Sequence, residues 1–129
     1  MVSVMIVDDA AFLRAFMREI LEKAGHEIIA EAENGWEAIE KYKMCRPELV
    51  TLDVHMPALD GMETLNQILK IDPNANVIIC SATGQRHYII DAVHHGAMDY
   101  ILKPFHPERV IESVNRVIEK AGLKTNPNH

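Results

Sequence analysis

The fold is decided by residues 48–53, ELVTLD, a short apolar run that a single acid, Asp53, closes. The same pattern occurs three more times, with apolar runs that end at polar or charged residues: 2–7 before Asp8 and Asp9, 76–80 before Ser81, and 99–102 before Lys103. Short runs rich in Val, Ile and Leu predict buried strands of a parallel sheet. The carboxyl ends of parallel strands lie on one edge, where open α/β sheets bind ligands. We therefore expect these polar residues to meet at that edge.

Helical patterns separate the apolar runs, and a further run, residues 27–31, adds a fifth strand. Apolar residues recur at helical spacing after each run, and each such stretch ends at a residue that stops a helix: Gly25, Pro47, Pro73, Gly96 and Gly122. This alternation predicts a (βα)5 chain, that is, a doubly wound, flavodoxin-like α/β fold with a parallel sheet in the order 2-1-3-4-5. We expect one domain over residues 1–122, a loop at 81–85 and a C-terminal tail at 123–129.

Composition excludes several classes of protein. A chain of 129 residues with 48% hydrophobic and 25% charged residues is ordinary for one globular domain. The net charge of -6, without a block of Lys and Arg, argues against nucleic-acid binding. No apolar stretch approaches the roughly 20 residues of a membrane span, and the start of the chain is too short for a signal peptide. The two cysteines do not suggest a disulfide, so we expect a cytoplasmic protein that does not bind membranes.

The three acids at the predicted edge point to a divalent cation. Two carboxylates about 4 Å apart repel by about 4 kcal/mol at an effective dielectric constant of 20, so a cation must neutralise such a cluster. Oxygen ligands suit Mg²⁺, which uses one or two carboxylates directly and keeps several waters. We expect Asp53 and one of Asp8 and Asp9 to bind the ion, together with a backbone carbonyl from the loop after Asp53.

The same residues would accept a phosphoryl group. Carboxylates form aspartyl phosphates, and phosphoryl transfer needs positioning and charge neutralisation above all. Asp53 is the best candidate nucleophile because it alone closes a central strand, while Lys103 and Ser81 would each contact a phosphoryl oxygen. Each residue also has an ordinary structural explanation, such as a helix N-cap for Asp9 or a turn hydroxyl for Ser81. Their joint occurrence at four strand ends favours the functional interpretation.

Several motifs resemble the receiver domain of bacterial two-component response regulators. They are Val7-Asp8-Asp9, Asp53-Val54-His55-Met56-Pro57 with Asp60-Gly61, Ser81-Ala82, and Tyr100-Ile101-Leu102-Lys103-Pro104-Phe105. Their order and spacing cover the chain from Val2 to about Ala121. Within this family the sequence is most similar to free-standing chemotaxis regulators, through residues 8–14 and 32–35.

The resemblance implies a role for each site residue. A histidine kinase would phosphorylate Asp53, Asp9 would bind Mg²⁺ directly, Asp8 would act through water, and the backbone carbonyl of His55 would complete the metal ligands. Ser81 and Tyr100 would form the switch, with the Tyr100 ring turning inward in the phosphorylated state. Lys103 would be the family lysine, followed by a cis bond to Pro104. His55 and Thr83 depart from common family patterns and leave the rate of autodephosphorylation open.

The resemblance also implies an output surface and partners. Phosphorylation would change the surface formed by the fourth helix, the fifth strand and the fifth helix, with five exposed candidate contacts: Tyr88, His95, Tyr100, Arg109 and Arg116. The partners would be a chemotaxis histidine kinase and the flagellar motor switch protein, and the protein would be a monomer. We expect a phosphoacceptor with slow autodephosphorylation rather than an enzyme.

Three alternatives stay open at this point. The chain could be a receiver that passes phosphate on within a phosphorelay, or one that binds something other than a motor. It could also be a small aspartyl-phosphate hydrolase, although the haloacid-dehalogenase group places an Asp-x-Asp motif after its first strand and adds a cap. A flavodoxin-like electron carrier is the third, but Asp8 and Asp9 would repel a flavin phosphate.

Overall fold

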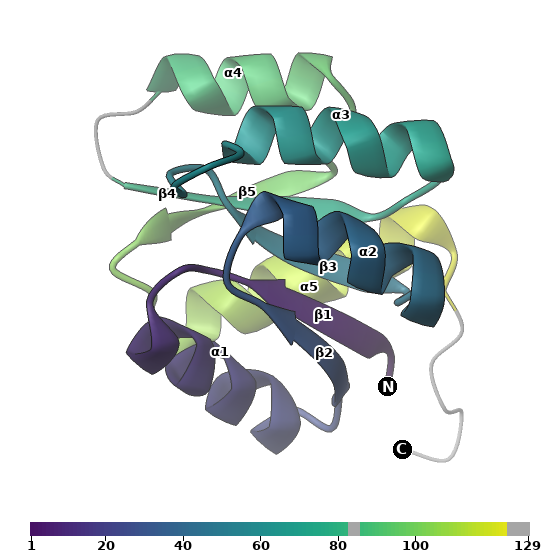
Figure 1. Ribbon diagram of the computed structural model, residues 1–129. Helices are drawn as coiled ribbons and strands as arrows, with labels where there is room; N and C mark the ends of the chain where they lie inside the picture. Colours follow the sequence, from purple (N-terminus) through teal and green to yellow (C-terminus); the bar gives the residue numbers. More distant parts are fainter. Residues whose placement is uncertain (83–85, 124–129) are drawn as a thin grey trace.

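Five parallel strands form one sheet in the order β2-β1-β3-β4-β5 (Figure 1). The computed structural model describes residues 1–82 and 86–123. Its strands are β1 (Ser3–Val7), β2 (Glu27–Ala32), β3 (Leu49–Asp53), β4 (Val77–Ala82) and β5 (Asp99–Lys103). The predicted doubly wound α/β fold and its strand order are confirmed.

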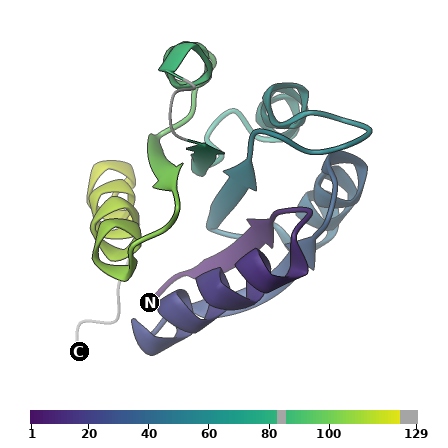
Figure 2. The ribbon, with the colours of Figure 1, turned by 90° about the vertical axis from the view of Figure 1, so that its left-hand side faces the viewer.

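Helices cover both faces of this sheet. They are α1 (Ala11–Lys23), α2 (Gly35–Cys45), α3 (Gly61–Ile71), α4 (Arg86–His94) and α5 (Pro107–Ala121). Helices α1 and α5 lie on one face, and α2, α3 and α4 lie on the other, as the view turned by 90° makes clear (Figure 2). Across residues 1–82 and 86–123, none of these helices has both the length and the apolar character that crossing a bilayer requires.

Each face of the sheet has its own apolar core, because successive strand side chains point to opposite faces. In β1, Met5 and Val7 pack with α2 and α3, whereas Val4 and Ile6 pack with α1 and α5. Strands that are apolar on both faces are expected in a sheet covered by helices on both sides. The runs that predicted the strands are therefore the centre of both cores.

Local signals set the helix starts. The Asn34 side chain accepts a hydrogen bond of 2.9 Å from the Glu37 backbone N–H at the start of α2, and Asp60 does the same for Glu63 in α3. Pro107 stands in the first turn of α5, where its missing N–H costs nothing. These side chains satisfy backbone donors that a helix start leaves free.

Four of the strands differ from the prediction at their carboxyl ends: β2, β3 and β5 each reach one residue further and β4 reaches two, whereas β1 ends at Val7 as predicted. The predicted loop at 81–85 is wrong for Ser81 and Ala82, which belong to β4 because their parallel pairing continues opposite Leu102 and Lys103 of β5. Residues 83–85, including Thr83, lie outside the described residues. Leu123, placed in the predicted tail, packs against the core under α5, and residues 124–129 of that tail are not among those described.

Candidate functional site

Three charged side chains at the ends of three strands meet at the carboxyl edge of the sheet. The Lys103 ammonium lies 3.2 Å from Asp8 Oδ2 and 3.2 Å from Asp53 Oδ1. Asp53 and Lys103 are the last residues of β3 and β5, and Asp8 directly follows β1. Both aspartates are buried, with 4% and 2% of their surface exposed. The lysine therefore bridges two buried carboxylates that lie 45 positions apart in the chain.

A third carboxylate, that of Asp9, completes the cluster. Asp8, Asp9 and Asp53 each offer an oxygen, and these oxygens all lie within 4.8 Å of one another. Asp9 is exposed, so it is the member of the cluster that faces solvent. The alternative of a helix N-cap for Asp9 is wrong, because α1 is capped at Ala10, without a side-chain hydrogen bond.

Backbone contacts hold the two buried acids in place. Asp8 Oδ1 accepts a hydrogen bond of 2.9 Å from the Ala10 N–H, while Arg14 Nη1 donates to the Asp8 carbonyl at 2.6 Å. Asp53 Oδ1 accepts from the His55 N–H at 3.2 Å. Each carboxylate is thus fixed by the loop that follows its own strand.

Gly61 lets α3 begin directly against the end of β3. A Cβ atom on this residue would lie 2.5 Å from the Asp53 carbonyl oxygen and 2.6 Å from the Val54 Cα. The Gly61 N–H donates to the Val54 carbonyl at 2.9 Å. Only glycine allows so close an approach, which tightens the loop below the acidic cluster.

Burial and charge shift two pKa values in this cluster. Burial raises the pKa of the Asp53 carboxyl above its usual value; Lys103 opposes this shift, and Asp8 adds to it. For Lys103, burial lowers the pKa, but the carboxylates of Asp53 and Asp8 outweigh that effect and the net shift is upward. The Lys103 ammonium thus neutralises only part of the negative charge of the three carboxylates, and a further cation can bind there.

The donor set of the cluster fits a hard divalent cation. Its ligand atoms are carboxylate oxygens only, and one of the three acids is open to solvent, which leaves room for the waters that Mg²⁺ retains. Beside the cluster lies a hollow of about 300 Å³ lined by Asp9, Glu33, Asn34, Pro57 and Ala58. A small ligand can therefore approach the cluster from the side of Asp9.

The other predicted site residues lie around this edge. Ser81 is fully buried near the end of β4, and its hydroxyl donates to the Ala82 carbonyl at 3.4 Å. His55 is exposed in the loop after β3. The peptide bond between Lys103 and Pro104 is cis. Tyr100 stands on β5 with 36% of its surface exposed, so its ring faces outward.

The predicted exposed contacts of the output surface need one correction. His95 and Tyr100 are exposed, but Arg109 and Arg116 are only half-buried and are committed to internal bonds. Arg109 Nη2 donates to the Tyr100 carbonyl, and Arg116 forms ion pairs with Asp99 and Glu112. A helical arginine looks the same in sequence whether it faces water or a neighbouring strand. For Tyr88, no side-chain placement is described.

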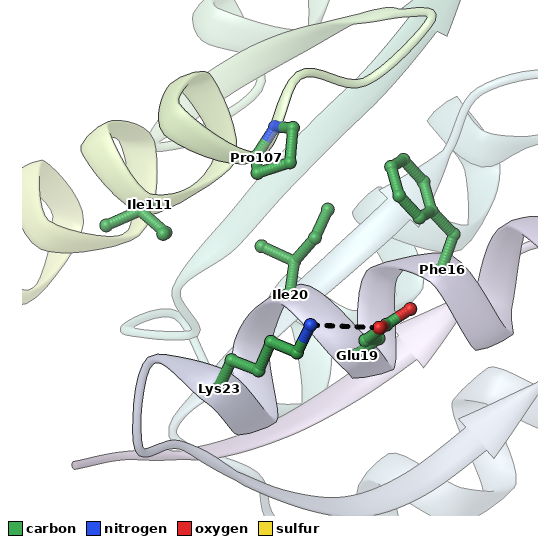
Figure 3. A pocket seen from close by; sticks show the side chains of 6 residues that line it. All are labelled: Phe16, Glu19, Ile20, Lys23, Pro107 and Ile111. Atoms are coloured by element: carbon green, nitrogen blue, oxygen red, sulfur yellow. Dashed lines mark ion pairs between the residues drawn. The ribbon is translucent and has the colours of Figure 1, made fainter.

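A separate hollow of about 220 Å³ lies between α1 and α5 (Figure 3). Its wall is mostly apolar, with Phe16 and Ile20 of α1 facing Pro107 and Ile111 of α5, and the Glu19–Lys23 ion pair at its rim. None of the acids of the cluster lines it. The hollow between α1 and α5 is therefore separate from the acidic site.

Sequence reasoning missed Arg14 as a support of the site. Its guanidinium joins the Asp8 carbonyl to Glu31 of β2, whose carboxylate also pairs with Arg18. Arg14 lies six positions after Asp8, and no pattern in the sequence distinguishes it from an arginine that faces solvent. The contact depends on how α1 is placed against β2.

Comparisons with known proteins agree with this geometry. The family model for the response regulator receiver domain matches residues 4–115. Chemotaxis protein CheY of Thermotoga maritima is 52% identical over 114 residues, which cover 88% of this chain and 95% of that protein. Chemotaxis protein CheY of Bacillus subtilis is 50% identical over 115 residues, which cover 89% of this chain and 96% of that protein.

Solved structures give the same result. The CheX–CheY–BeF3–Mg²⁺ complex from Borrelia burgdorferi matches with a TM-score of 0.87 and 37% identity, over 90% of this chain and 88% of that one. The receiver domain of NtrX from Brucella abortus matches with a TM-score of 0.85 and 32% identity, over 90% of this chain and 98% of that one. The chain therefore belongs to the response regulator receiver domain family.

Proposed function

We propose that this chain is a free-standing chemotaxis response regulator that accepts a phosphoryl group on Asp53. The observation that carries the proposal is the Lys103 ammonium, 3.2 Å from the carboxylates of both Asp8 and Asp53 at the ligand-binding edge of the sheet. Relatives of about 50% identity, which span nearly the whole chain, are chemotaxis proteins. Their name supports the same pathway for this protein.

Asp53 acts as the nucleophile in this proposal. One of its carboxylate oxygens forms a bond to phosphorus, and the bond from phosphorus to the imidazole nitrogen of a phosphorylated kinase histidine breaks. The imidazole nitrogen keeps the electron pair. Lys103 is already beside the Asp53 carboxylate and needs only a small movement to contact a phosphoryl oxygen. Ser81, one strand over, would donate its hydroxyl to another oxygen.

The acids and a backbone carbonyl would hold Mg²⁺. Asp9 and Asp53 would bind the ion directly, Asp8 would act through water, and the His55 carbonyl would supply another oxygen. Receiver domains bind Mg²⁺ at an acidic pocket, and the cluster of three carboxylates within 4.8 Å supports this assignment. When bound, the ion neutralises negative charge on the transferring phosphoryl oxygens. The CheY of Borrelia burgdorferi is solved with Mg²⁺, which supports the same ion here.

Phosphorylation then switches the surface formed by α4, β5 and α5. Ser81 moves toward the phosphoryl group, and the exposed Tyr100 ring turns inward. The cognate donor is a chemotaxis histidine kinase, and the flagellar motor switch protein reads the changed surface. A CheY of this family is solved in complex with the chemotaxis protein CheX, which supports a chemotaxis protein as partner. The protein acts as a phosphoacceptor that loses its phosphate slowly, with residues 1–122 as its single working unit.

The test is the mass of the intact protein after incubation with Mg²⁺ and a small phosphodonor. We expect a gain of one phosphoryl group, which disappears in Asp53→Asn. The matched control is Asp99→Asn, which alters another buried strand aspartate, at the opposite end of β5 from Lys103, and keeps the gain of mass. Unchanged phosphorylation of Asp53→Asn would overturn the assignment. Rapid turnover of phosphodonor without a trapped phosphoprotein would favour a hydrolase, and transfer of the phosphate to another histidine would favour a phosphorelay intermediate.

A further inference from the structure

Arg109 of α5 reaches across to the edge strand β5 and contacts Tyr100 twice. Its Nη2 donates to the Tyr100 carbonyl at 2.8 Å, and its Cζ lies 5.6 Å from the centroid of the Tyr100 ring. Because β5 is the last strand of the sheet, this guanidinium supplies a hydrogen bond of the kind that a neighbouring strand would supply. A cation over the face of an aromatic ring is attracted by it.

Another nitrogen of this guanidinium is unsatisfied. Arg109 Nη1 is buried and has no hydrogen-bond partner among the residues that the structure describes. A buried donor without a partner disfavours the arrangement that buries it. The position of the Arg109 side chain therefore depends on its two contacts with Tyr100 and not on a complete set of hydrogen bonds.

The Tyr100 ring stands at a hollow that touches the acidic site. This hollow, of about 440 Å³, is lined by Tyr100, Leu102, Lys103, Pro104, His106 and Arg109. Lys103 contacts the carboxylates of Asp8 and Asp53, so one wall of the hollow belongs to the acidic cluster. Tyr100 and Leu102 both keep more than a third of their surface exposed, which leaves the ring without a tightly packed position on this side.

We propose that Arg109 is a positioning residue for the Tyr100 ring. Its hydrogen bond to the Tyr100 carbonyl places the guanidinium beside the ring, and the stacking contact holds the ring outward. Inward rotation of the ring breaks the stacking contact while the carbonyl bond is kept. Arg109 thus sets the fraction of unphosphorylated protein that already has the inward ring. This inference rests on the Tyr100 switch of the proposed function.

The test follows the ring directly by ¹⁹F NMR of protein labelled with 3-fluorotyrosine. The chain has three tyrosines, and Tyr100→Phe identifies the signal of Tyr100. In the wild type, Mg²⁺ and a phosphodonor define the signal position of the phosphorylated state. In unphosphorylated Arg109→Met we expect the Tyr100 signal to move toward that position. The ratio of inward to outward ring should rise roughly two- to fivefold, the factor that an exposed cation–π contact is worth.

Two further variants and an internal reporter keep this test decisive. Lys120→Met removes a positive charge from the exposed last turn of α5, and its Tyr100 signal should stay at the wild-type position. The signal of buried Tyr42 reports on folding. If the Tyr42 signal changes in Arg109→Met, Arg109→Lys takes its place as the test variant. Lysine keeps the charge but not the planar group, so the Tyr100 signal should move by a smaller amount in the same direction.

Each outcome separates the two proposals. A Tyr100 signal that stays at the wild-type position in the deciding Arg109 variant, or that moves equally in Lys120→Met, overturns the role of Arg109 and leaves the switch intact. A wild type that gains the phosphoryl mass but shows no movement of its Tyr100 signal overturns the switch itself, and the role of Arg109 with it.

Discussion

Two buried aspartates at opposite edges of the sheet show how differently the same residue can be used. Asp99, the first residue of β5, accepts hydrogen bonds at Oδ2 from Ser113 Oγ at 2.8 Å and from Arg116 Nη1 at 3.1 Å. Asp53, the last residue of β3, is held by Lys103 and the His55 N–H, both at 3.2 Å, with two more carboxylates close by. The two residues are 7% and 2% exposed.

The difference lies in what surrounds each carboxylate. Asp99 is enclosed by donors from α5, and its nearest cation is an arginine that can bind it at fixed geometry. Asp53 shares one lysine with Asp8 and lies near a third acid, so negative charge is in excess. The Asp99 carboxylate is bound by two donors from one helix and stabilises the fold, whereas the cluster around Asp53 keeps an excess of negative charge that a cation can neutralise. Burial alone does not identify a functional aspartate.

The largest expected difference is in stability. We expect Asp99→Ala to lower the free energy of unfolding by about 3 kcal/mol, because it leaves the fully buried Ser113 hydroxyl and the Arg116 guanidinium without their acceptor. Asp53→Ala should cost little or be stabilising without metal, since it removes one of three mutually repelling acids. Urea unfolding in the presence of EDTA measures both. An equal loss in the two variants would contradict the distinction.

Added Mg²⁺ should stabilise the folded protein only where the carboxylate of Asp53 is present. At ten times its dissociation constant a ligand that binds only the folded state stabilises it by about 1.4 kcal/mol. We expect this gain in the wild type and in Asp99→Asn, and a much smaller gain in Asp53→Asn, which loses one carboxylate ligand. Urea midpoints measured with and without Mg²⁺ give the result. The same gain in Asp53→Asn would place the ion elsewhere.

The sequence predicts the surroundings of Asp53 well and those of Asp99 poorly, and the reason is physical. Asp53, Asp8 and Lys103 each end an apolar run, and the geometry of a parallel sheet alone brings such positions to one edge. Asp99 starts a run, and its partners depend on the placement of α5, fourteen or more residues away. The internal contacts of Arg14 and Arg109 escape prediction for the same reason. The sequence predicts a loop at Ser81 because strand pairing with Leu102 is not a local property. The chemical roles assigned to Asp53, Ser81 and Tyr100 stay predictions.

Tyr42 and Asp72, like Ser113 and Asp99, form a hydrogen bond between a hydroxyl and a carboxylate, and raising the pH should remove it. The hydroxyl of buried Tyr42, on α2, donates to Asp72 Oδ2 at 3.2 Å where α3 ends. Burial, and then the Asp72 carboxylate, raise the pKa of Tyr42 from 10.0 to about 12. The folded state therefore holds this proton more tightly than the unfolded chain does. The resulting stabilisation is fully present below pH 10 and is lost as the pH rises from about 10 to about 12.

Tyr42→Phe should lower the free energy of unfolding by about 1 kcal/mol at pH 7, the net value of one hydrogen bond. The difference from the wild type should then shrink between pH 10 and pH 12, because only the wild type must keep a buried phenol protonated there. Urea unfolding of both proteins at pH 7, 9 and 11 measures the change. A difference that stays constant to pH 11 would mean that the folded state does not raise the pKa of Tyr42, and neither burial nor the Asp72 carboxylate would then hold its proton.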